Sequence, residues 1–85
     1  MRTIVIRAKC LNEKEEAHAY LKKRLRVADY HGSNLDALYD VLTSLGRETR
    51  ILVLQPAQAE DYGEKILAVI REAEEANPKL ALRLL

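Results

Sequence analysis

Residues 50–55, Arg-Ile-Leu-Val-Leu-Gln, followed at once by Pro56, are the stretch from which the fold can be argued. The run is short and nearly continuous in apolar residues, and it stops at a proline. Parallel strands that are covered on both faces have this composition, whereas strands with one solvated face alternate. We therefore predict a strand over residues 50–55 that lies in a parallel sheet, covered on both faces and ended by Pro56.

Two further strands are predicted near the two ends of the sequence. Residues 2–8, RTIVIRA, are rich in β-branched side chains, and residues 79–85, KLALRLL, alternate. Apolar residues at helical spacing lie between the strands, over residues 12–25, 35–45 and 59–76. The order β-α-α-β-α-β predicts the α/β class: a small three-stranded parallel sheet packed by about three helices. We expect one domain over residues 1–85.

Several residues mark the ends of these helices. Asn12, with an acid three residues on, fits a loose capping box for the first helix. Gly32 permits a turn that a side chain would resist, and Ser33 or Asn34 can cap the second helix. Gly46 is predicted to end that helix in the left-handed conformation.

Composition narrows the functional classes. The chain has 85 residues, of which 48% are hydrophobic and 32% charged, as in ordinary globular proteins and unlike disordered tails. The single Cys10 excludes an intramolecular disulfide and a cysteine-based zinc site. The apolar runs are too short for a membrane span or a signal peptide. We expect a cytoplasmic protein with no membrane partner.

Charge is distributed unevenly along the chain. The formal net charge is only +1, but residues 1–27 carry a balance of +5 and residues 28–64 a balance of −5. One interpretation is that both parts are simply solvated. The other is that the middle of the chain makes an acidic surface, which would steer a basic partner toward it.

The helix predicted over residues 35–45 has two faces. Its leucines recur at spacings of three and four and account for the core: Leu35, Leu38, Leu42 and Leu45. A second face gathers Asp36, Tyr39, Asp40 and Thr43. Aspartate is a poor residue for a helix interior, so two of them around an aromatic ring indicate a patch for a cationic partner. The alternative is that Asp36 only complements the helix dipole, which leaves Tyr39 and Asp40 unexplained.

Residues 30–43, Tyr-His-Gly-Ser-Asn-Leu-Asp-Ala-Leu-Tyr-Asp-Val-Leu-Thr, resemble the signature of the barstar family, whose members inhibit ribonucleases of the barnase type. The family pattern is roughly Tyr-Tyr-Gly-x-Asn-Leu-Asp-Ala-Leu-aromatic-Asp-x-Leu. Residues 66–73 resemble the last helix of the family. The resemblance implies a barstar-like domain that is an inhibitor and not an enzyme, with its motif helix and the preceding loop entering the cationic cleft of a nuclease.

The resemblance also implies a set of partner-binding residues. Asp40 would lie where a substrate phosphate lies, with Asp36 in support, and two tyrosines would add apolar contact area. Glu64 matches a peripheral acid of the family, and Asn34 is expected mainly to shape the loop. The full set is Tyr30, His31, Asn34, Asp36, Tyr39, Asp40, Thr43, Ser44 and Glu64.

Other functions remain open at this point. The expected partner is a barnase-type ribonuclease or, alternatively, a different nuclease toxin of a bacterial toxin–antitoxin pair, for which the chain would be the immunity protein. A small RNA-binding domain is a third reading, because Lys22, Lys23, Arg24 and Arg26 form a basic cluster. No nucleophile and base can be paired in the sequence. We expect no catalysis, no cofactor, no metal site, no direct nucleic-acid binding under the inhibitor reading, and a monomer.

Overall fold

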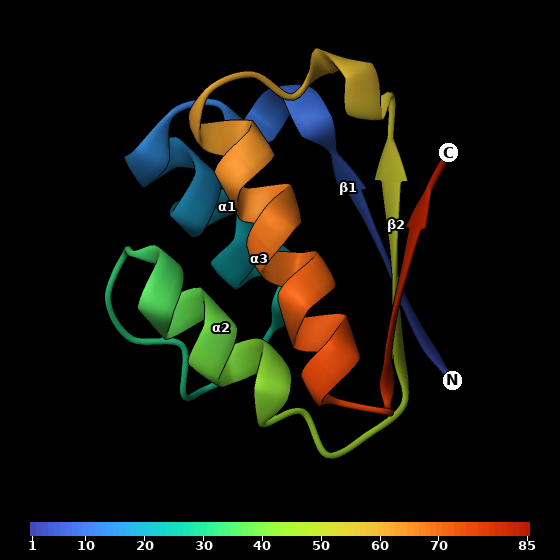
Figure 1. Ribbon diagram of the computed structural model, residues 1–85. Helices are drawn as coiled ribbons and strands as arrows, with labels where there is room; N and C mark the ends of the chain where they lie inside the picture. The colour runs from blue at the N-terminus through green and yellow to red at the C-terminus, as the bar shows by residue number, and fades with distance from the viewer.

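The three strands of the chain form one parallel sheet in the computed structural model, which describes all 85 residues (Figure 1). The strands β1 (Arg2–Arg7), β2 (Thr49–Leu54) and β3 (Leu80–Leu84) pair in the order β1-β2-β3. The helices are α1 (Lys14–Leu25), α2 (Leu35–Thr43) and α3 (Tyr62–Ala76), with 3₁₀ turns η1 (Ala8–Leu11) and η2 (Pro56–Gln58). The predicted α/β class and element order are confirmed. None of the helices combines the length and the apolar character needed to cross a membrane.

All three helices cover the same face of the sheet (Figure 1). The strand order follows the chain order, and crossovers of one hand that step in one direction must lie on one face. Burial along β2 alternates accordingly: Ile51 and Val53 are buried, whereas Arg50 is exposed and Leu52 is half-buried. The prediction that this strand is covered on both faces is therefore wrong. Its apolar run continues onto an open face.

The core lies between the covered face of the sheet and the three helices. Its largest fully buried apolar side chains are Ile6, Leu11, Leu21, Leu25, Leu38, Leu42, Ile51, Ile66, Ile70 and Val53. Burying an aliphatic side chain of this size stabilises a fold by about 1.5–3 kcal/mol before the loss of conformational entropy is counted. The predicted leucine stripe of α2 is confirmed, with Leu35 only half-buried and Val41 also in the core.

The first helix is capped by a different residue from the one predicted. The Glu13 carboxylate accepts hydrogen bonds from the backbone N–H groups of the next two glutamates, at 3.3 and 2.8 Å. Asn12 instead joins segments far apart in sequence: its Oδ1 accepts from the N–H of Glu60 at 2.7 Å, and its Nδ2 donates to the carbonyl of Gln58 at 2.9 Å. A Cβ on Gly63 would collide with Asn12 Oδ1, so the glycine makes room for this contact.

The predictions for α2 are confirmed at its N-terminal end and are wrong at its C-terminal end. Asn34 caps it, since its Oδ1 accepts from the N–H of Ala37 at 2.7 Å, and Gly32 has the predicted positive φ of 85°. Gly46 does not adopt the left-handed conformation, so that prediction is wrong. The helix has already ended at Ser44, and the chain turns there so that Leu45 enters the core.

Helix α3 begins at Tyr62, three residues later than predicted. The chain after Pro56 first makes the 3₁₀ turn η2. It then passes through Asp61, whose φ of 46° and ψ of −110° lie outside the helical region.

Side chains close both edges of the sheet. At β1, the Arg24 guanidinium donates twice to the carbonyl of Val5, at 3.0 and 2.8 Å, and the Tyr20 hydroxyl accepts from the N–H of Arg7 at 2.9 Å. At β3, Glu74 accepts from the N–H of Leu82 at 2.9 Å. Backbone groups that are already bonded cannot template another strand, so these contacts oppose edge-to-edge association.

Asn77 connects the ends of three elements. Its side chain is 5% exposed, and its Nδ2 donates to the carbonyls of Leu42 and Leu45, at 2.9 and 3.1 Å. Its Oδ1 accepts from the N–H of Lys79 at 3.0 Å. One amide therefore satisfies the last turn of α2 and shapes the turn between α3 and β3.

We predict that Asn77→Ala lowers the free energy of unfolding by about 2–3 kcal/mol, because two buried carbonyls lose their donor. Urea unfolding followed by circular dichroism measures the loss. Lys79→Ala is the matched control: it removes the exposed bond from Nζ to the carbonyl of Gly46 in the same turn and should cost less than about 0.5 kcal/mol. Equal losses in the two variants would contradict this role for Asn77.

Candidate partner-binding site

The polar face of α2 presents two carboxylates one helical turn apart. Asp36 and Asp40 are both exposed. The side-chain hydrogen bonds at this helix come from Asn34, Thr43 and Asn77, and none of them involves either carboxylate. Both aspartates therefore keep their oxygens available to an external donor.

A recess lies beside Asp40, where the loop before α2 runs along the helix. It has a volume of about 180 Å³ and is lined by Val27, Asp29, Asp40, Val41, Ser44 and Leu45. Two carboxylates thus share a concavity that also has three apolar side chains. A long cationic side chain suits such a surface, since its methylene stem can cover the apolar part while its charged head meets the carboxylates.

A buried imidazole holds the loop before α2 in place from the protein interior. His18, on α1, has no exposed surface; its Nδ1 lies 2.5 Å from the Tyr30 hydroxyl, and its Nε2 lies 2.6 Å from the Tyr62 hydroxyl. Both ring pairs are edge-on, with centroids 6.1 and 5.6 Å apart. The hydrogen-bonded triad joins α1, the loop and the first turn of α3.

The triad is electrically neutral at pH 7. Burial, assisted by Lys14 and Lys22, lowers the pKa of His18. Burial, followed by the nearby Tyr62, raises the pKa of Tyr30, and burial raises the pKa of Tyr62. A neutral imidazole has one donor and one acceptor nitrogen, so one tyrosine accepts from His18 and the other donates to it. The Lys22 ammonium lies 5.4 Å from the centre of the Tyr30 ring, and this cation–π contact is favourable.

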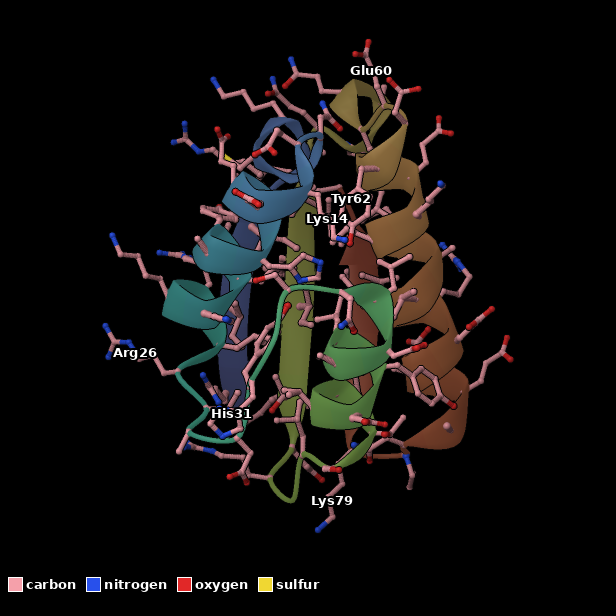
Figure 2. All side chains as sticks on the ribbon, turned by 90° about the vertical axis from the view of Figure 1, so that its left-hand side faces the viewer. Lys14, Arg26, His31, Glu60, Tyr62 and Lys79 are labelled. Carbon is pink, nitrogen blue, oxygen red and sulfur yellow. The ribbon has the colours of Figure 1, made fainter.

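The residues predicted from the sequence differ in accessibility. Tyr30 is buried, with 5% exposed, and its hydroxyl is already bonded within the protein. Tyr39 and Thr43 are half-buried, and the rest are exposed: His31, Asn34, Asp36, Asp40, Ser44 and Glu64. Figure 2 shows His31 on the loop that precedes α2.

The structure brings the loop and α2 residues together but leaves Glu64 apart from them. Glu64 lies in the first turn of α3. In both views α2 lies beside the other half of α3, far from that turn (Figures 1 and 2). Any contact that Glu64 makes with a partner is therefore peripheral to the two aspartates.

Two residues of this site escaped the sequence analysis. His18 shares the apolar stripe of α1 with Leu21 and Leu25, three and seven residues on, and this spacing could have placed it in the core. Asp29 was not among the residues predicted to bind a partner. It meets Asp40 because the loop returns along the helix, and no local spacing signals that meeting.

The fold and this site together describe a small α/β domain that presents an acidic helix and the loop before it. The chain belongs to the barstar family: the family described as Barstar (barnase inhibitor) matches residues 1–85. It is also similar to a protein of Bacillus subtilis (strain 168) named "Putative ribonuclease inhibitor YrdF", with 38% identity over 80 residues that cover 88% of each protein. The resemblance found in residues 30–43 is thereby confirmed.

The lowered pKa of His18 predicts a loss of stability in mild acid. Above its ordinary pKa of 6.5 the imidazole is neutral in both the folded and the unfolded chain. Below that pH the unfolded chain binds a proton that the folded chain resists. The free energy of unfolding should then fall by up to about 1.4 kcal/mol per pH unit, until the pH reaches the lower pKa of the folded state.

Urea unfolding at pH values from 8 to 5 tests this dependence, and the Hε1 resonance of His18 reports its pKa directly. His18→Gln should lose this part of the pH dependence, whereas His31→Gln, at an exposed position, should keep it. A His18 resonance that titrates at or above pH 6.5 would contradict the prediction.

Proposed function

We propose that this protein inhibits a ribonuclease by placing the acidic face of α2 in the enzyme's cationic cleft. The observation that carries the proposal is the pair of exposed carboxylates, Asp36 and Asp40, one turn apart on a helix whose other face is core. Membership of the barstar family and similarity to a protein named as a ribonuclease inhibitor support it.

The proposed inhibition depends on carboxylates that take the place of the phosphate groups of RNA. A ribonuclease cleft binds phosphate through converging arginine, lysine and histidine side chains. Asp40 would accept their hydrogen bonds in place of phosphate oxygens, and Asp36 would pair with a second cation one turn away. The cap at Asn34 and the leucines of α2 hold the helix rigid, which reduces the entropy lost on binding.

The recess beside Asp40 would provide a second contact for the enzyme. Asp29 and Asp40 together would receive one long basic side chain of the enzyme, with Ser44 at its margin. His31 and Tyr39 would add contact surface around this centre. Tyr30 would act mainly by positioning the loop, because so little of it is exposed. Glu64 would make at most a peripheral contact.

The proposed biological role is that of an immunity protein without catalytic activity of its own. Such a protein would act in the cytoplasm of a bacterial cell, where an active nuclease would destroy the cell's own RNA. The target would be a barnase-type ribonuclease or another nuclease toxin with a basic cleft.

Asp40→Ala should weaken inhibition of a barnase-type ribonuclease by at least about 2 kcal/mol, or roughly thirtyfold in the inhibition constant, because it removes the central anion. Hydrolysis of a fluorogenic oligoribonucleotide measures the constant. The stability of the variant should change little, since the Asp40 side chain is exposed.

Glu15→Gln is the matched control, because it removes one exposed acid from α1 instead of α2. It should inhibit as well as the unaltered protein. Undiminished inhibition by Asp40→Ala, or an equal loss in both variants, would refute the proposed anchor.

Salt should act chiefly on the rate of association. Screening of the acidic surface removes its long-range attraction, whereas desolvated pairs at the centre of an interface are screened much less. Stopped-flow measurements between 50 and 500 mM NaCl should show the association rate constant falling more than the dissociation rate constant rises. A change confined to dissociation would be inconsistent with electrostatic steering.

A further inference from the structure

A cationic recess lies at the free edge of β1, on a surface that the proposed inhibition does not use. It has a volume of about 250 Å³ and is lined by Arg2, Thr3, Ile4, Lys23, Arg24 and Arg26. Four of these six residues carry a positive charge, and none is an acid. They come from β1 and from the end of α1, which are adjacent in space but about twenty residues apart in sequence.

Arg24 is held in place before any ligand arrives. Its Nε and Nη2 both donate to the carbonyl of Val5, at 3.0 and 2.8 Å. A guanidinium has five N–H donors, so this contact fixes the group and leaves donors for a ligand. A flexible arginine would lose side-chain entropy on binding, and Arg24 has already lost much of it in folding.

Positively charged side chains lie close together at this recess. Partial burial, followed by the neighbouring Arg47 and Arg26, lowers the pKa of Arg2. The guanidinium of Arg2 is thus repelled by Arg26, which also lines the recess, and by Arg47, which lies outside its lining. No acid lines the recess, so an anion bound there would offset this repulsion.

Arg26 stands at a position that suits glycine better. It follows α1 in the left-handed conformation, with φ 52° and ψ 49°, where a side chain costs about 1 kcal/mol relative to glycine. Figure 2 shows its side chain extending outward from the protein. Lys22, by contrast, lies over the ring of Tyr30 and does not line the recess.

We propose that this recess, formed by Arg2, Thr3, Lys23, Arg24 and Arg26, binds a phosphate group. A tetrahedral anion can accept hydrogen bonds from guanidinium forks and an ammonium group on several sides at once, which a planar carboxylate does less well. No aromatic side chain lines the recess, so recognition is of the phosphate and not of a base. Inorganic phosphate and the backbone of single-stranded RNA are the two sources of this chemistry.

Titration of the ¹⁵N-labelled full chain tests the proposal at 20 mM NaCl. Inorganic phosphate is added in one series and a ten-nucleotide oligouridylate in another. Saturable shifts should appear in the amides of residues 2–4 and 23–26 and in the Nε resonance of Arg24. Absence of these shifts in both series would overturn the proposal.

A double variant, Lys23→Gln with Arg26→Gly, should weaken binding at least about tenfold, because two charged donors are lost. It is expected to fold, since glycine suits the left-handed conformation at position 26. For the oligouridylate, the slope of log affinity against log salt should fall in magnitude by about 1.4. The control, Lys65→Gln with Arg71→Gln, removes two charges from the exposed surface of α3 and should bind as before.

The comparison of ligands identifies the source of the phosphate. Saturation by inorganic phosphate, with the oligouridylate no tighter, shows a site for a free anion; tighter binding of the oligouridylate shows a site for the RNA backbone. A decaglutamate peptide that bound these residues more tightly than either would overturn phosphate recognition, as would equal weakening in the double variant and its control.

Discussion

The loop before α2 keeps its shape through one buried imidazole. His18 lies between two tyrosine hydroxyls, one from that loop and one from the first turn of α3, so a single side chain of α1 ties three segments together. No side-chain nitrogen or oxygen that is fully buried lacks a hydrogen-bond partner in this protein. Loss of any member of the triad would leave polar groups unsatisfied in the core, so the triad stabilises the observed position of the loop.

The second constraint is the order of the strands. Because β1, β2 and β3 lie side by side in chain order, every helix covers the same face of the sheet, and the other face meets solvent. The chain compensates at the edges, where Arg24, Tyr20 and Glu74 occupy backbone groups that another strand could use. These contacts oppose pairing of the sheet with another strand at either edge.

The sequence predicts well those features that depend on neighbours along the chain. The strands, the order of elements along the chain, the leucine stripe of α2, the cap at Asn34 and the turn at Gly32 all follow from local spacing or backbone conformation. Features that join distant segments were missed or misread. Asn12 looks like a helix cap until Glu60 comes to lie beside it.

The same distinction explains the errors about the site and the sheet. Leu52 and Leu54 prolong an apolar run on the open face, so composition alone could not show that β2 has a solvated side. The two aspartates of α2 could be found because one helix carries both. Asp29 could not, because its meeting with Asp40 depends on the path of the loop.

The separation of charge within the molecule has a consequence for how it turns in an electric field. The strands carry four arginines and no acid, and α1 carries four bases and two acids, whereas α2 and α3 together carry six acids and two bases. The molecule therefore has a permanent dipole moment that runs from α2 and α3 toward the sheet and α1. The field of a strongly cationic enzyme exerts a torque on such a dipole, so the rotational search is shortened before the two surfaces touch.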